Sequence, residues 1–304
     1  MELNNLLEEY ILECKIRNYT ATTVKQKEIL LKSFIKYLEN EFGIRKVEEV
    51  KRQNLQQYIL DEKEKGNKAL TINTKIKMAR SMFKYALDEN YINNNVFDRI
   101  KLLKQEKPKF SVFSDDEIKR MLKVWNERSY TNIKNKTIIS LFLDCGIRCS
   151  ELRNLKLDNI QYESIKILGK GNKWRVVPIS LKTRKLMLKY ERARESLLQK
   201  KKIECDYYFM NQYKDHIQDN SPIQKMVLYT ANKANVRSIV RASPHSLRHY
   251  YAIKSLELGT PIHVLSRNLG HSSIKTTEIY LSQITNEQIE QEAIQKTKSP
   301  LNFL

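Results

Sequence analysis

Four short segments, far apart in the chain, carry side chains suited to act together on a phosphodiester. They are residues 146–151 (GIRCSE), 169–173 (GKGNK), 245–249 (HSLRH) and 269–280 (LGHSSIKTTEIY). The candidate site residues are Arg148, Lys170, His245, Arg248, His271 and Tyr280, with Glu151 in a supporting role. Guanidinium groups match a phosphate with paired hydrogen bonds, and a phenol that loses its proton can attack phosphorus. Such a set could break the bond covalently without a metal.

The two arginines are distinguished by their surroundings. Arg148 follows a glycine that can end a helix, and Glu151 is close enough in sequence to support it. Arg248 shares a helical face with His245, because residues three apart are neighbours on a helix. We expect both arginines to hold the phosphate. His245 and His271 would position it and move protons, since imidazole titrates near neutral pH.

The proton donor and the nucleophile are assigned by position. Lys170 lies in a predicted hairpin turn, from which an ammonium can protonate a leaving oxygen, although Lys173 competes for this role. Tyr280 is one of sixteen tyrosines, and only its place in the last segment singles it out. Its phenol has an ordinary pKa of about 10 and must lose its proton as it attacks. Tyr250 and Tyr251 are expected to be packing residues.

The order and context of these segments resemble the tyrosine recombinase/phage integrase family, over residues 112–285. The shorter members, of the Xer type or from transposons, are the most similar. The resemblance implies a tyrosine-type DNA strand transferase, a site-specific recombinase that works through a 3′-phosphotyrosyl intermediate and a Holliday junction. It implies a homotetramer on two duplex sites, accessory DNA-bending proteins as further partners, and no cofactor or metal. Integration, excision and resolution stay open, as does an origin in a mobile genetic element.

Three alternatives compete with this interpretation. A type IB topoisomerase-like enzyme uses similar groups to nick and rejoin DNA, and a non-catalytic DNA-binding relative could keep the fold. Zinc is the third, because Cys145 and Cys149 are four residues apart, as are His245 and His249. Neither pair has the spacing of a zinc finger, so zinc is disfavoured.

Hydrophobic spacing predicts a mainly α fold. Apolar residues at helical intervals predict four helices within residues 1–103, which resemble the family's helical core-binding (SAM-like) domain. The catalytic domain, residues 112–285, is expected to be mostly helical with a small antiparallel sheet, from two strand-like runs at 164–168 and 174–179. Residues 104–111 are polar, contain a proline and are interpreted as a linker. The tail, 286–304, would contact a neighbouring protomer or cover its own domain.

Charge and cysteine usage fit a nucleic-acid partner and a reducing compartment. The chain of 304 residues has a net charge of +20, of which +6 falls in residues 1–110 and +14 in the rest. Basic charge along the whole chain is typical of proteins that bind an anionic polymer. Four scattered cysteines do not make a disulfide framework, and neither a signal peptide nor a membrane span is evident. We therefore expect a cytoplasmic protein, associated with the nucleoid when bound to DNA.

Overall fold

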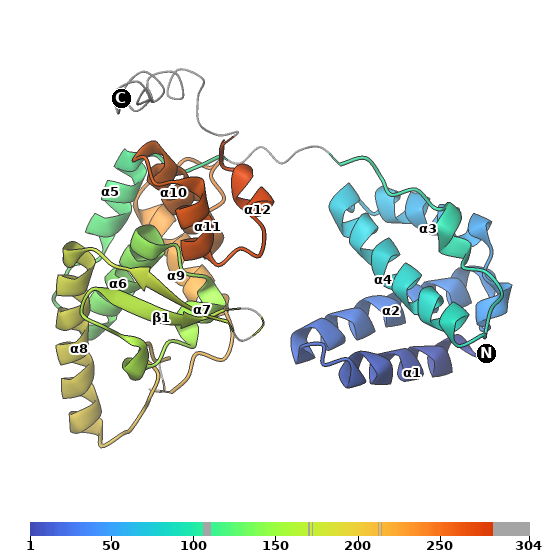
Figure 1. Cartoon of the computed structure of the whole chain (residues 1–304), viewed down its shortest axis with the longest axis horizontal. Coiled ribbons are helices and arrows are strands. Elements are labelled where there is room, and N and C mark those ends of the chain that lie inside the picture. Colours follow the sequence, from blue (N-terminus) through green and yellow to red (C-terminus); the bar gives the residue numbers. More distant parts are fainter. Residues whose placement is uncertain (106–110, 170, 172, 212, 214, 282–304) are drawn as a thin grey trace, which may run out of the picture. The chain divides into compact units, whose positions relative to one another are not determined.

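The chain divides into two compact units, Met1–Pro108 and Lys109–Leu304, each of which is described by itself (Figure 1). The computed structural model describes residues 1–105, 111–169, 171, 173–211, 213 and 215–281. Most of the proposed linker, Lys170 and the proposed tail lie outside the described residues. The mainly α fold with one small antiparallel sheet confirms the predicted fold class.

The first unit is a bundle of four α-helices around one apolar core. The helical spacing of the sequence explains it, because the residues that recur on one face are the ones that are buried. Leu6, Leu38, Ile72 and Phe83 are completely buried. Its elements are α1 (Leu3–Ile16), α2 (Ala21–Phe42), η1 (Val47–Glu49), α3 (Arg52–Glu64), α4 (Ala69–Asp88) and η2 (Val96–Arg99).

The second unit is built around α6, which packs against α8 and α10. Ile139, Leu141 and Phe142 on α6 are completely buried, so this helix is the centre of the core. The elements are α5 (Asp115–Val124), α6 (Tyr130–Cys145), α7 (Cys149–Arg153), η3 (Leu157–Asn159), β1 (Ser164–Leu168), β2 (Trp174–Pro178), α8 (Leu181–Lys201), α9 (Ser221–Lys233), α10 (Pro244–Glu257), α11 (Ile262–Leu269) and α12 (Lys275–Glu278). The ends of α6 and α11 and the starts of α7 and α10 adjoin candidate site residues.

Local signals fix where the key helices begin and end. Ser114 and Glu117 form a reciprocal capping box at the start of α5, with bonds of 3.2 and 2.8 Å. Ser243 accepts a bond from the amide of Ser246, which starts α10 with a proline in its first turn. Gly146, at φ +57°, ends α6 in the left-handed conformation that glycine adopts without strain.

Strands β1 and β2 form an antiparallel hairpin, with Ser164 opposite Pro178 and Leu168 opposite Trp174. Side chains alternate between the two faces, as in any strand. Ile165 and Val177 are completely buried, whereas Trp174 is exposed. No helix in the described part of the chain is long and apolar enough to cross a bilayer.

Candidate functional site

Arg148 and Glu151 meet at the first turn of α7. The backbone amide of Arg148 donates to Glu151 Oε2 at 2.9 Å, and its Nη1 donates to Oε1 at 2.9 Å. The Glu151 side chain is 5% exposed, and that of Arg148 is 33% exposed. Burial alone would raise the pKa of Glu151, but bonds and charge from Arg175 and Arg148 hold it below its usual value. The carboxylate is therefore ionised and fixes a guanidinium that still reaches solvent.

Arg148 also reaches the segment that contains His271. Its Nη2 donates to the carbonyl of Gly270 at 2.9 Å, although the two residues are 122 positions apart. Gly270 ends α11 with φ +65°. This bond brings the first and the last candidate segments together.

Arg248 lies deeper and bonds to the ends of two helices. Its Nη1 donates to the carbonyl of Gly146 at 2.5 Å, and its Nη2 donates to the carbonyl of Leu269 at 2.7 Å. The last carbonyls of a helix carry partial negative charge and suit a cation. Burial and the charge of Arg148 lower the pKa of Arg248 to about 10, which leaves it protonated at neutral pH. In this structure Arg248 thus joins α6 to α11 at the base of the site.

His271 is held in one tautomer by its two neighbours. Its Nε2 lies 3.1 Å from Arg248 Nη2, and its Nδ1 lies 2.8 Å from Thr277 Oγ1. Arginine can only donate, so Nε2 accepts and the ring proton is on Nδ1, which donates to the threonine. Burial, with the charges of Arg248, Arg148 and Arg175, lowers the pKa of His271 to about 4. The ring is neutral at physiological pH.

Two further histidines connect α10 to Tyr280. The rings of His245 and His249 meet edge to face, with centroids 4.1 Å apart. The His249 ring in turn meets that of Tyr280 at 5.2 Å. Burial and the nearby arginines lower the pKa of His245, and burial with the charge of His245 lowers that of His249 to about 4. His249 is buried, whereas the ring of His245 is only partly shielded by its neighbours and the residue keeps its access to solvent.

The Tyr280 side chain is only 3% exposed, and the nearby charges that act on it are those of Arg248 and Arg148 in the same chain. It packs in a small apolar cluster with Ala252, Leu265 and Leu269. Burial raises the pKa of Tyr280, while the charges of Arg248 and Arg148 act in the opposite direction. The phenol is thus neutral, and those same arginines are the groups that would favour its ionisation.

The structure brings six of the seven predicted residues together: Arg148, Glu151, His245, Arg248, His271 and Tyr280. Lys170 lies outside the described residues. Its neighbour Gly169 closes the described part of the hairpin, where its amide donates to the carbonyl of Lys173 at 2.9 Å. The Lys173 side chain is exposed.

Arg175 is the residue that the motif-based prediction missed. Its Nη1 and Nη2 donate to the two oxygens of Glu151 at 2.8 and 2.7 Å. Its Nε donates to the carbonyl of Asn268 at 2.9 Å. The alternation of β2 carried the signal, since Arg175 is two residues before the buried Val177 and must share its face.

The zinc alternative finds no support in the geometry around Cys145. This cysteine is completely buried in the core, and its thiol donates to the carbonyl of Leu141 at 3.0 Å. Burial raises its pKa to about 12 and that of Cys149 to about 11. Among the residues that the structure describes, no group of three or more His, Cys, Asp or Glu side chains is placed to hold a metal.

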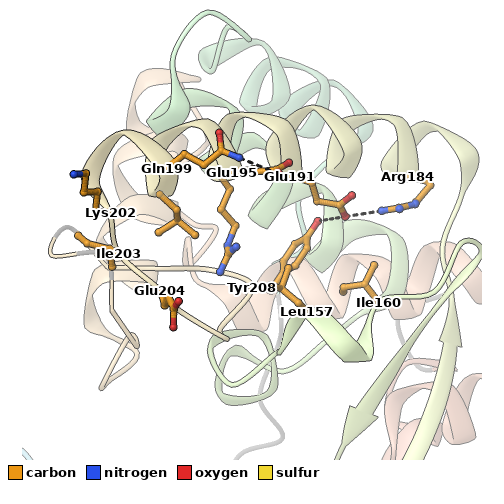
Figure 2. A pocket seen from close by; sticks show the side chains of 12 residues that line it. Leu157, Ile160, Arg184, Glu191, Glu195, Gln199, Lys202, Ile203, Glu204 and Tyr208 are labelled. Carbon is orange, nitrogen blue, oxygen red and sulfur yellow. Dashed lines mark hydrogen bonds and ion pairs between the residues drawn. The ribbon is translucent and has the colours of Figure 1, made fainter.

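Figure 2 shows a pocket lined in large part by residues of α8. Leu157 and Ile160 line one side of it. Its polar groups bond to one another: Glu191 accepts from Arg184 at 2.6 Å and from the Tyr208 hydroxyl at 2.9 Å. None of the six clustered candidate residues lines it. The candidate site is thus defined by converging charged groups and not by this cavity.

Models of known protein families match both units of the chain. Residues 111–287 match the model of the phage integrase family, and residues 3–90 match the phage integrase N-terminal SAM-like domain. The chain belongs to the phage integrase family. It is a tyrosine recombinase, an enzyme of the DNA strand transferase class.

Named relatives cover most of this recombinase. It is 32% identical to tyrosine recombinase XerC of Thermodesulfovibrio yellowstonii over 259 residues, which span 82% of this chain and 84% of the relative. It is 30% identical to XerC of Bacillus pumilus over 268 residues, 87% of each chain.

Two solved structures share the fold at lower identity. A lambda integrase dimer bound to a COC′ core site has a TM-score of 0.73 at 13% identity, over 91% of this chain and 97% of that one. XerH bound to a palindromic difH substrate, in a post-cleavage complex, has a TM-score of 0.72 at 21% identity, over 96% and 84%.

Proposed function

We propose that this recombinase cleaves and rejoins duplex DNA at specific sites through a covalent 3′-phosphotyrosyl intermediate. The observation that carries the proposal is the convergence of Arg148, Arg248, His271 and Tyr280 from three separated segments of one chain. Cations around a neutral phenol favour its ionised form and also bind a phosphate. Both effects are needed for a phenol to attack a phosphodiester.

In the proposed reaction, the Tyr280 oxygen forms a bond to the scissile phosphorus and displaces the 5′ oxygen of the next nucleotide. The phenol proton passes to the neutral ring of His245 or His271 as the bond forms, and Lys170 donates a proton to the departing 5′ oxygen. Arg148 and Arg248 stabilise the charge that grows on the non-bridging oxygens. Neutral His271 and His245 orient the phosphate. The 5′ hydroxyl of a partner strand then attacks the phosphotyrosine and reverses the step.

Strand exchange between two duplexes needs more than one protomer. We propose a tetramer on two sites that passes through a Holliday junction, with the first unit and the catalytic unit both contacting the duplex. The basic charge of both parts of the chain supports this arrangement. Residues 286–304, which lie outside the described residues, would contact a neighbouring protomer or cover their own domain. Such an enzyme would act in the cytoplasm, on the DNA of the nucleoid, in integration, excision or resolution.

A suicide substrate tests the nucleophile. Footprinting first defines a protected duplex, and a nick beside the cleavage point then lets the released 5′ end diffuse away and traps the adduct. Wild type should form a covalent protein–DNA band that resists denaturant, and Tyr280→Phe should form none while it still binds. Tyr250→Phe is the matched control, because its hydroxyl bonds to Asp115 on α5 and not to the site. An adduct with Tyr280→Phe would refute the assignment.

Holliday-junction resolution separates the proposed function from that of a topoisomerase. A synthetic junction built from the protected site should be resolved by wild type into duplex products. An adduct with no resolution, together with relaxation of supercoiled plasmid, would assign the chain to nicking and rejoining without exchange. Binding with no adduct would leave a non-catalytic relative.

A further inference from the structure

Arg175 joins three parts of the catalytic unit through one guanidinium. It lies on β2, bonds both oxygens of Glu151 at the start of α7, and bonds the carbonyl of Asn268 in α11. Its side chain is only 9% exposed. A two-pronged bond with little access to water is strong, because neither partner is well solvated when it opens. The hairpin, α7 and the end of α11 are thus fixed to one another here.

The backbone around Arg175 leaves room for its guanidinium. A Cβ at Gly270 would lie 3.0–3.2 Å from the Nη1, Cζ and Cδ atoms of Arg175. A Cβ at Gly169 would lie 3.3 Å from Nη1. Two glycines from separate candidate segments therefore face this one side chain, in both cases within the contact range of a close approach.

The charge on Glu151 is shared between two arginines. Its Oε1 accepts from Arg148 at 2.9 Å and from Arg175 at 2.8 Å, and its Oε2 accepts from Arg175 at 2.7 Å. If Arg175 were neutral, the buried carboxylate would act on Arg148 alone and offset its charge. With Arg175 present, one buried arginine balances the carboxylate, and the charges of Arg148 and Arg248 remain for a ligand.

We propose that Arg175 is a positioning residue for DNA cleavage: it neutralises Glu151 from behind, so that Arg148 keeps its charge for the scissile phosphate, and it anchors the segment that contains Gly270 and His271. The inference rests on the proposed function and adds a third arginine to it. Arg175 is buried and acts through Glu151, so it does not touch the phosphate.

A charge-balance cycle tests this role. Arg175→Gln should lower the single-turnover rate of adduct formation by about 100-fold, the effect of losing one group that stabilises developing charge, while DNA affinity changes only a few fold. Adding Glu151→Gln to that variant removes the unbalanced carboxylate and should restore the rate by on the order of tenfold or more. A residue with only a structural role predicts a double variant no faster than the single one, and that result would overturn the inference.

Two further measurements keep the test decisive. Arg184→Gln is the matched control, because Arg184 is also a largely buried arginine paired with a glutamate, Glu191, but lies on α8 beside the pocket of Figure 2. It should lower the melting temperature without changing the rate per folded molecule. If Arg175→Gln does not fold, Arg175→Met replaces it in the same cycle, since methionine removes the charge but keeps a long unbranched side chain. It should then cleave more slowly than wild type at unchanged affinity.

A substrate with an uncharged methylphosphonate at the scissile position gives an independent readout. The ratio of wild-type to Arg175→Gln rates should shrink on this substrate, because less charge needs stabilising. An unchanged ratio would contradict the charge-balance role. If wild type forms no adduct on the unmodified suicide substrate, the proposed function is refuted. If Arg175→Gln cleaves that substrate at the wild-type rate, this inference alone is refuted.

Discussion

Gly146→Ala is expected to destabilise the catalytic unit more than its change in size implies. Gly146 has φ +57°, where an alanine costs about 1–2 kcal/mol relative to glycine. Its Cβ would also lie 2.3 and 2.7 Å from the Cδ1 and Cε1 atoms of Tyr251. Overpacking of this kind costs about 1–3 kcal/mol. Together the two effects predict a loss of about 2–5 kcal/mol in the free energy of unfolding.

Urea unfolding measures this loss in the catalytic unit specifically. The two tryptophans of the chain, Trp125 and Trp174, both lie in that unit, so intrinsic fluorescence follows its transition. Gly171→Ala is the control, because Gly171 also has positive φ, +74°, but its Cβ would meet nothing within 4 Å. It should lose only the backbone part, about 1–2 kcal/mol.

The difference between the two variants isolates the clash with Tyr251. Equal losses for Gly146→Ala and Gly171→Ala would show that the Tyr251 ring moves aside without cost, and would refute the reasoning.

The same substitution should also affect activity. The carbonyl of Gly146 accepts a bond from Arg248, so a shifted backbone should also slow adduct formation in molecules that remain folded.

Two other predictions concern single charged groups. Arg148→Lys keeps the positive charge but loses the paired hydrogen bonds of a guanidinium, so the single-turnover cleavage rate should fall by about 100-fold or more. DNA affinity, measured by filter binding, should be retained. Equal loss of cleavage and affinity would contradict the assigned role. A hydrogen bond from Arg237 is the main cause that lowers the pKa of Glu117 to about 2. The ionised carboxylate therefore stabilises the folded state fully at pH values above the ordinary pKa of a glutamate. This contribution is lost as the pH falls toward 2. Glu117→Gln should therefore be less stable than wild type at pH 7 and equal to it near pH 2 in urea titrations, and a gap that stays constant with pH would count against the pair.

The sequence predicted best those features that depend on neighbouring residues. The glycine at 146, expected to end a helix, does end α6, and the cap formed by Ser114 and Glu117 at the start of α5 is equally local because the two residues are three apart. The hairpin and the helix that begins at Pro244 follow from equally local patterns. Because a cap or a turn is decided within a few residues, these predictions needed no knowledge of the tertiary structure.

Features that depend on distant partners were harder to predict. Arg175 is 24 residues from Glu151 and 93 from Asn268, and no local pattern states that these groups meet. Helix α9 (Ser221–Lys233) was not predicted, although its buried residues Ile223 and Val227 have helical spacing. The sequence also could not show that Arg248 bonds to backbone carbonyls, because that depends on where two helices end.

The bonds of Arg248 have a consequence for how the enzyme is made in the cell. Arg248 joins the carbonyl of Gly146, 102 residues earlier, to that of Leu269, 21 residues later. A nascent chain on the ribosome therefore cannot form both of these bonds until the segment through Leu269 has been synthesised. Because Arg248 comes between its two partners in the sequence, the bond to Gly146 can form before the bond to Leu269 during synthesis.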